Sequence, residues 1–104
     1  MKLGIDLVLI DRFRSIEQGF EKRFCHPSEI DYLHNLASEE VRVTYLASLW
    51  AIKEALFKAD NKFFDFSKIK LVKEKSGVWT FEDWKISTSH EGNMLVAIAA
   101  LEEV

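Results

Sequence analysis

The chain has 104 residues, and its 14 lysines and arginines against 17 aspartates and glutamates give a net charge of −3. The basic residues are divided 6 and 8 between residues 1–52 and 53–104, which argues against a general nucleic-acid binder. We expect a single domain over residues 1–104, with no apolar run of the roughly 18 residues that cross a membrane. The single cysteine, Cys25, excludes an internal disulfide, and with no secretory signal visible we expect a cytoplasmic protein.

The first predicted element is a buried strand. Residues 2–10 form a nearly continuous apolar run that contains one charge, Asp6. A polar stretch, residues 11–21, follows it with Ile16 and Phe20 at helical spacing. The chain is therefore expected to have two to three helices, depending on whether this stretch forms one.

Two helix start signals come next. Ser28 follows a proline and can cap a helix that ends near Asn35. Ser38 precedes two glutamates, placed where the helix dipole favours acids, and predicts a long helix over residues 39–59. Asp60 and the asparagine after it form a plausible stop.

The remaining sequence has the period of strands. Alternation over residues 68–73, a turn at 76–77, further alternation over 79–88 and a turn at 91–93 lead to a strong final strand over 94–101. The order of one strand, helices and then a three-stranded antiparallel meander predicts the α+β class.

Three features of these elements bear on chemistry. Asp6 is a lone carboxylate in an apolar strand, Glu54 lies four residues from Trp50 and from Lys58 on one helix face, and Ser87–His90 end a strand. Taken singly, each has an ordinary explanation: an edge-strand aspartate, a surface Glu–Lys pair, and a turn histidine. Taken together, two carboxylates suggest a site for Mg²⁺, which proteins hold with one or two carboxylates, waters and substrate phosphates.

Three motifs in this order also resemble a known family. Gly4-Ile5-Asp6, then Trp50-Ala51-Ile52-Lys53-Glu54-Ala55 with Lys58, then Ile86-Ser87-Thr88-Ser89-His90 resemble the 4′-phosphopantetheinyl transferases. The length and the final strand resemble the short, single-domain holo-(acyl-carrier-protein) synthase type. The resemblance implies the transfer of the phosphopantetheine arm of coenzyme A to a serine of an apo acyl carrier protein, with release of 3′,5′-ADP, as in fatty acid biosynthesis.

The resemblance also implies roles for individual residues. Asp6 and Glu54 match the magnesium ligands, and Lys58 matches a lysine that neutralises the pyrophosphate of coenzyme A. Lys53 matches a further phosphate-contacting lysine, and Ser89 with His90 matches a pair that faces the nucleotide. Either Glu54 or a metal-bound water could take the proton of the attacking serine. The family type is a homotrimer with sites between subunits, which agrees with the hydrophobic content of 48%.

The carrier protein should dock on exposed cations, because carrier proteins are acidic. Arg12 and Arg14 follow the Asp6 strand most closely and are the expected docking residues, although residues 11–23 carry a net charge of only +1 and an ordinary solvated helix is the alternative.

Three positions depart from the family pattern. Leu49 stands where the family usually has an arginine, residues 60–62 replace a glycine-rich turn, and residues 76–78 replace a glycine-x-proline step. These departures leave open how adenine and the 3′-phosphate are held. They also support the alternative function, a catalytically impaired coenzyme A-binding oligomeric module of the same fold. A hydrolase that uses the same metal and lysines is a third interpretation.

Overall fold

The computed structural model describes residues 1–103 and contains one five-stranded antiparallel sheet with the strand order β1-β5-β4-β3-β2. The long strands are β1 (Lys2–Leu9), β4 (Trp84–Glu91) and β5 (Met94–Leu101). The short strands β2 (Val72–Lys73) and β3 (Trp79–Phe81) extend the sheet at its far edge. The first strand of the chain therefore pairs along its whole length with the last one, from Lys2 opposite Leu101 to Leu9 opposite Met94.

Two α-helices lie on one side of this sheet: α1 (Pro27–His34) and α2 (Glu39–Ala59). The side chain of Ser38 caps α2 as predicted, because its hydroxyl accepts a hydrogen bond from the Val41 amide at 3.4 Å. The cap of α1 is His26 and not Ser28: the His26 ring accepts from the Ser28 amide. Glu29 completes this capping box by accepting from the His26 amide.

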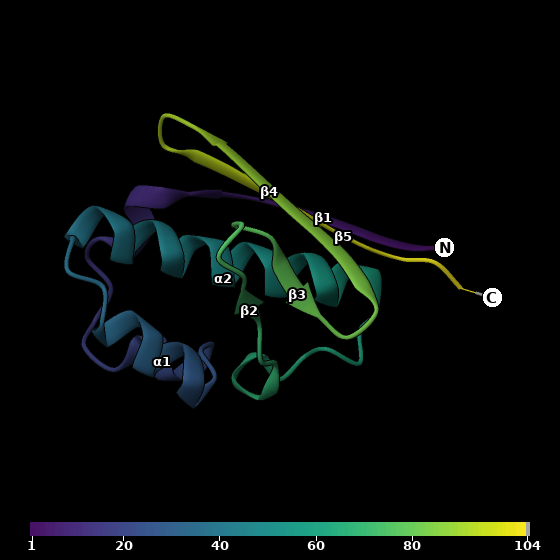
Figure 1. Cartoon of the computed structure of the whole chain (residues 1–104), viewed down its shortest axis with the longest axis horizontal. Coiled ribbons are helices and arrows are strands. Elements are labelled where there is room, and N and C mark those ends of the chain that lie inside the picture. The colour runs from purple at the N-terminus through teal and green to yellow at the C-terminus, as the bar shows by residue number, and fades with distance from the viewer. Residues whose placement is uncertain (104) are drawn as a thin grey trace.

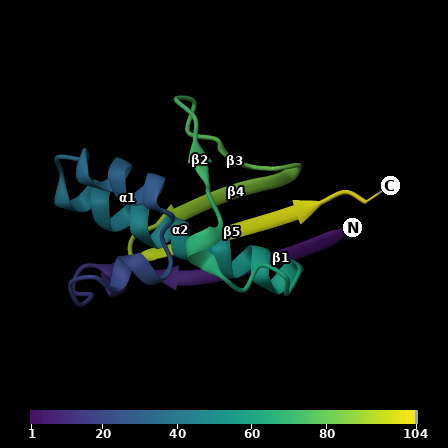
Figure 2. The same ribbon diagram turned by 90° about the horizontal axis from the view of Figure 1, so that it is seen from below.

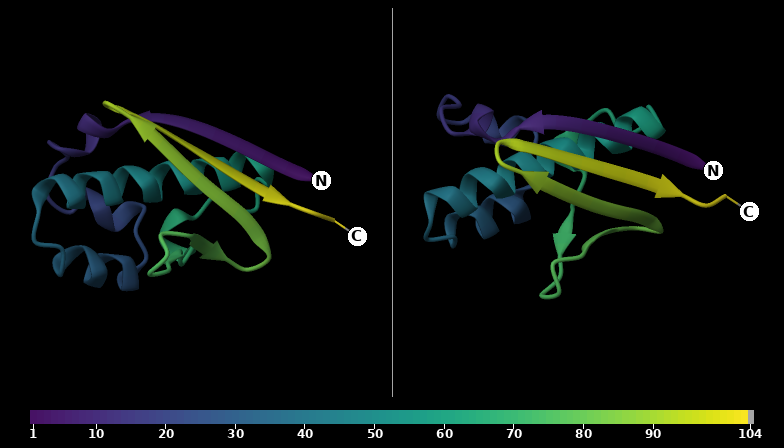
Figure 3. Two further views of the ribbon diagram at one scale, coloured as in Figure 1. Left: turned by 45° about the horizontal axis from the view of Figure 1, so that its top comes forward. Right: turned by 90° about the horizontal axis from the view of Figure 1, so that it is seen from above.

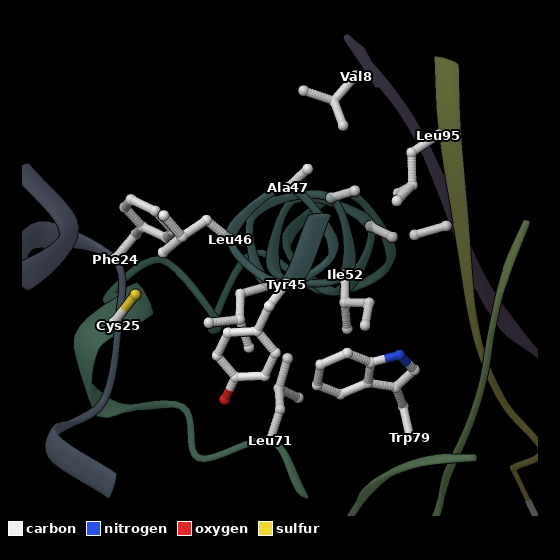
Figure 4. Packing of buried hydrophobic residues seen from close by; sticks show 14 of the residues in the cluster. Val8, Phe24, Cys25, Tyr45, Leu46, Ala47, Ile52, Leu71, Trp79 and Leu95 are labelled. Carbon is white, nitrogen blue, oxygen red and sulfur yellow. The ribbon is translucent and has the colours of Figure 1, made fainter. Parts of the chain in front are cut away.

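Helix α2 is the centre of the core. It crosses the sheet beneath β1, β5 and β4, while α1 lies on its far side (Figures 1 and 2). Seen along its axis, α2 has Val8 and Leu95 of the sheet on one side and Phe24, Cys25 and Leu71 on the other (Figure 4). Burial on both sides explains why α2 has eleven buried residues, far more than a helix with one apolar stripe.

Among residues 1–103, no helix covers the opposite face of the sheet, as the view with the strands in front shows (Figure 3). Side chains that alternate along β1 and β5 point to this face and are exposed by 38 to 63%: Leu3, Ile5, Leu7, Leu9, Met94 and Ile98. A large exposed apolar surface of this kind marks an interaction site.

The α+β class is confirmed, and the structure differs from the sequence prediction in two details. The expected middle strand over 79–88 is divided by a two-residue turn, where Glu82 has a φ of 49°, so the strands after α2 number four among the described residues. The stretch after β1 forms two 3₁₀ helices, η1 (Ile10–Phe13) and η2 (Phe20–Arg23), and no α-helix. A further 3₁₀ turn, η3 (Phe66–Lys68), precedes β2.

Candidate active site

The first site residues meet where β1 passes over the C-terminal half of α2. Along β1, Gly4, Asp6 and Val8 face the helix, while the residues between them face outward. Gly4 has no side chain at the crossing point, which lets the strand lie directly on the helix backbone at Ala55. Asp6, two residues further along, is thereby brought over the helix face that carries Glu54 and Lys58.

Lys58 joins the strand to the helix. Its Nζ atom donates hydrogen bonds to Asp6 Oδ1 at 2.9 Å and to the Ile5 carbonyl at 3.1 Å. The Asp6 side chain is 13% exposed and that of Lys58 50% exposed, so the pair lies at the surface with its cationic end accessible. The predicted neighbourhood of Asp6 and Lys58 is thus present in the structure.

Glu54 belongs to the same cluster. Partial burial raises its pKa above the usual value, and the nearby negative charge of Asp6 raises it further. Lys58 and Arg12 act in the opposite direction but do not cancel the shift. The carboxylates of Asp6 and Glu54 therefore repel each other, and a cation placed between them would relieve the repulsion.

The donor set suits a magnesium ion in one respect. Two carboxylates beside an accessible surface are what proteins commonly supply to Mg²⁺, which keeps waters and substrate phosphates in its other positions. Among residues 1–103 no cluster of three or more His, Cys, Asp or Glu residues could enclose a metal by itself. Any ion held here would take its remaining oxygen atoms from waters or from a bound ligand.

Lys53 lies away from this cluster, and the expected phosphate contact is corrected by the structure. Its side chain is 0% exposed. The ammonium donates to the Phe24 carbonyl at 2.7 Å, to Glu29 Oε1 at 2.6 Å and to the Phe66 carbonyl at 2.9 Å. A lysine whose three protons are all committed inside the core cannot reach a ligand.

Ser89 and His90 are both exposed on β4, and they point to opposite faces of the sheet. Ser89 stands opposite Val96, which in turn stands opposite Leu7, so it shares the exposed apolar face. His90 lines a cavity of about 340 Å³ with Thr44 near the start of α2. Because Thr44 and Glu54 are about 15 Å apart along the helix axis, His90 is not brought to the Asp6 cluster of its own chain.

The two candidate docking arginines have different surroundings. The Arg14 guanidinium donates to Glu40 at 2.6 Å and to Asp11 at 3.0 Å, and these carboxylates raise its pKa. Arg12 lies over the Trp50 ring, 5.0 Å from its centroid. Only Arg12 of the two lines the cavity described next.

This cavity, of about 540 Å³, lies within the segment that joins β1 to α1. Its wall combines the cations Arg12 and Arg23 with the apolar side chains of Phe13, Ile16 and Phe20. Arg23 lies over the Phe20 ring at 5.8 Å, in the way that Arg12 covers Trp50. The sequence predicted Arg12 and Arg14 as docking residues, and it gave neither Arg23 nor Phe20 that role, although both belong to the same stretch.

The sequence pattern of the 4′-phosphopantetheinyl transferase superfamily matches residues 2–99 of the chain. The chain belongs to this superfamily. The match includes Asp6, Glu54, Lys58, Ser89 and His90, and it confirms both the resemblance and the transferase class expected from the motifs.

Among its relatives, this transferase is 40% identical over 101 residues to a Mycoplasma mobile protein named holo-[acyl-carrier-protein] synthase, covering 97% of this chain and 89% of the other. Two solved structures share its fold. The holo-[acyl-carrier-protein] synthase of Neisseria meningitidis has a TM-score of 0.84 at 22% identity, covering 98% of each chain. That of Bacillus anthracis, solved in complex with CoA (3′,5′-ADP), has a TM-score of 0.80 at 22% identity, covering 94% of this chain and 92% of the other.

Two of the transferase's departures from the family pattern have a structural account. Leu49 is fully buried, so its position on α2 faces the core and not the ligand side. Asp60 caps the C-terminal end of α2 and pairs with Lys2 of β1, which lowers the Asp60 pKa. The turn at residues 60–62 thus fixes the start of β1 to the end of α2 through an ion pair.

Within residues 1–103, no helix has the length and apolar character needed to span a membrane.

Proposed function

We propose that the chain transfers the 4′-phosphopantetheine arm of coenzyme A to a serine of an apo acyl carrier protein, in a magnesium-dependent reaction that releases 3′,5′-ADP. The cluster of Asp6, Glu54 and Lys58 is the observation that carries this proposal. It combines two mutually repelling carboxylates with an accessible ammonium, which is the charge pattern needed to bind a cation together with a diphosphate. Family membership and the names of the relatives supply the group that is transferred.

In this proposal Asp6 and Glu54 would hold the magnesium ion. When bound, the ion would offset the negative charge that develops on the leaving 3′,5′-ADP. Lys58, beside Asp6, would orient the diphosphate relative to the attacking serine. Phosphoryl transfer depends mainly on this kind of positioning and electrostatic stabilisation.

Lys58 has a separate role. Its ammonium is half exposed and held beside Asp6, so a short movement of the side chain would let it donate to a phosphate oxygen. Glu54 is the candidate general base, because its carboxylate lies beside Asp6 and Lys58 at the proposed reaction centre. A base outside the protein chain remains the alternative for that proton transfer.

The carrier protein is proposed to dock at the cavity between Arg12 and Arg23. These arginines present charge beside apolar side chains, which suits an acidic protein with an apolar contact at its centre. Arg14 contributes less, because its guanidinium is already neutralised by Glu40 and Asp11. The cavity lies next to Trp50, one helical turn before Glu54, so a carrier bound there is close to the proposed reaction centre.

We further propose a homotrimer in which each site is shared by two subunits. The uncovered apolar face formed by β1 and β5 supplies a surface for association. Ser89 lies on that face, and His90 is distant from Glu54 in its own chain, so both are better placed to serve a neighbouring subunit. The expected setting is the cytoplasm, and the expected carrier is that of fatty acid biosynthesis.

The direct test incubates the chain with coenzyme A, magnesium and an apo carrier protein, followed by mass spectrometry of the carrier. The proposal requires an added arm of about 340 Da and its loss in Asp6→Ala and Glu54→Ala variants that remain folded. Tight binding of coenzyme A with no mass change would support the catalytically impaired module, for which Leu49 and Asp60 are the motivating departures. Release of free phosphopantetheine would indicate the hydrolase instead.

A further inference from the structure

The buried pair of Lys53 and Glu29 has no part in the reaction proposed above. Both side chains are almost completely enclosed, at 0 and 1% exposure, and their nearest charged atoms are 2.6 Å apart. Burying two charges costs several kcal/mol that their mutual attraction only partly returns. An apolar pair of similar volume would serve a core equally well, so the two charges point to a role beyond packing.

Each charge is bound to backbone that lies outside regular helices and strands. The Lys53 ammonium binds the carbonyl of Phe24, just after η2, and that of Phe66, at the start of η3. The Glu29 carboxylate accepts from the amide of Leu71 at 2.7 Å, before β2. The Lys53–Glu29 pair therefore connects three irregular segments to α2. The point of attachment on the helix is Lys53, the residue beside Glu54.

Among these segments, residues 10–24 are the one that forms the arginine-lined cavity. At the start of the segment, the Ile10 amide donates to the Asn93 carbonyl at 2.8 Å. At its end, the Phe24 carbonyl accepts from Lys53. The segment contains only short 3₁₀ turns, so its position depends on these two attachments, on the Arg14–Glu40 pair, on the bond from the Asp11 amide to Asn93 and on its buried rings.

The attachment at Phe24 also sets the packing around Trp50. The Phe24 ring lies edge-on to Trp50, with ring centroids 5.3 Å apart, and 5.8 Å from both Phe13 and Phe20. Phe13 and Phe20 are the apolar wall of the cavity, and Trp50 is the ring beneath Arg12. A shift of the Phe24 backbone would thus move the apolar wall of the cavity, and Arg12 with it, relative to Glu54.

We propose that Lys53 is a positioning residue for the carrier protein: balanced by Glu29, its ammonium fixes the Phe24 carbonyl and so holds the docking cavity in register with Glu54. This inference rests on the proposed function, because it requires that the carrier docks at this cavity. It predicts that loss of the pair weakens use of the carrier while the coenzyme A site at Asp6 and Lys58 stays intact.

The test uses the double variant Lys53→Met/Glu29→Gln, which removes both charges and leaves neither one buried without a partner. We expect a lower thermal stability, because the Phe24 and Phe66 carbonyls lose their donor, together with a KM for the carrier raised about tenfold and a KM for coenzyme A that is unchanged. Trp84→Phe is the matched control, since it loosens the core beside Phe63, away from residues 10–24. It should lower stability and leave both KM values as they are.

Lys53→Arg provides a second test of the positioning role if the double variant does not fold. It keeps the positive charge beside Glu29 but displaces the donor from the Phe24 carbonyl, so the carrier KM should rise by a smaller factor, about threefold. An unchanged carrier KM in a folded variant, or an equal rise in both KM values, would overturn the positioning role. Absence of transfer by the wild-type chain would instead contradict the proposed function itself.

Discussion

Gly4 and Ala55 are in such close contact that a Cβ atom built on Gly4 would lie 1.8 Å from the Ala55 carbonyl oxygen. The same atom would lie 2.9 Å from the Ala59 amide nitrogen. Both neighbours are helix backbone and cannot turn aside as a flexible side chain would. The glycine is therefore what allows β1 to cross α2 closely enough for Asp6 to meet Lys58.

Replacing Gly4 by alanine is predicted to separate β1 from α2. The clash with fixed backbone should lower the free energy of unfolding by about 3 kcal/mol or more, and transfer should fall because Asp6 moves away from Lys58. Urea denaturation measures the first effect and the carrier assay, at a temperature where the variant is folded, the second. Gly77→Ala is the control: its positive φ should cost about 1 kcal/mol, but nothing lies within 4 Å of the added methyl group.

Replacing Glu54 by glutamine is predicted to abolish transfer and slightly stabilise the protein. The pKa of Glu54 is raised in the folded state, so the unfolded chain releases this proton more readily and stability falls as pH rises above about 4.5. Glutamine removes this penalty, which is present at neutral pH and absent below the unfolded pKa. The melting temperature at pH 7 should rise by about 1–2 °C, a small amount because water screens a partly exposed group.

The comparison that checks this prediction is the melting temperature of both proteins at pH 7 and at pH 4, without magnesium. The gain from Glu54→Gln should be smaller at pH 4, where wild-type Glu54 is largely protonated. An equal gain at both pH values would mean that the substitution acts through packing and not through charge.

The sequence was sufficient to predict the cluster of Asp6, Glu54 and Lys58, because this part of the candidate site depends on the regular geometry of a helix and a strand. Steps of four along a helix place Glu54 and Lys58 on one face, and a lone carboxylate in an apolar strand identifies Asp6. Lys53 lies beside Glu54 in the same motif, yet its burial depends on Glu29, which is distant in sequence. A local pattern carries no information about such a contact.

The irregular parts of the chain were harder to predict for a related reason. The stretch 11–21 has helical spacing at Ile16 and Phe20, but it forms 3₁₀ turns whose flanks are held by distant parts of the fold. The Ile10 amide donates to the Asn93 carbonyl, and the Lys53 ammonium donates to the Phe24 carbonyl. The pairing of Arg14 with Glu40 is likewise a tertiary contact. The sequence thus identified a cationic segment without showing which of its arginines remain available.

Substitution of the individual arginines is predicted to separate docking from internal pairing. Arg12→Gln and Arg23→Gln should each raise the KM for the carrier by about five- to tenfold with little effect on the KM for coenzyme A, since both line the cavity. Arg14→Gln should change the KM for the carrier by about twofold or less, because the charge of Arg14 is already matched by Glu40 and Asp11. Steady-state kinetics at two salt concentrations measures this, and a dominant effect of Arg14 would place docking elsewhere.

Leu7→Lys is predicted to convert the proposed trimer into monomers. The Leu7 side chain is 63% exposed, so the lysine should cost the isolated subunit almost nothing, but it would bury a charge if the apolar face is an interface. Light scattering should then give the subunit mass of 12.1 kDa for the variant and about three times that value for the wild type. Val78→Lys, at an exposed residue of the loop between β2 and β3, should keep the wild-type mass.

Mixing two inactive variants tests whether each site is shared between subunits. Asp6→Ala damages the cluster on α2 and β1, while His90→Ala damages only the strand-end contribution. If His90 serves the neighbouring subunit, a site is intact when a chain with native Asp6 lies beside a chain with native His90. In trimers assembled at random from equal amounts of the two variants, about a quarter of all sites meet this condition. Co-refolding the two variants and assaying transfer measures this fraction. A mixture as inactive as its components, in variants that form mixed trimers by mass, would mean that His90 and Asp6 must come from the same chain. The position of His90 beside Thr44, far along α2 from Glu54, argues against that outcome.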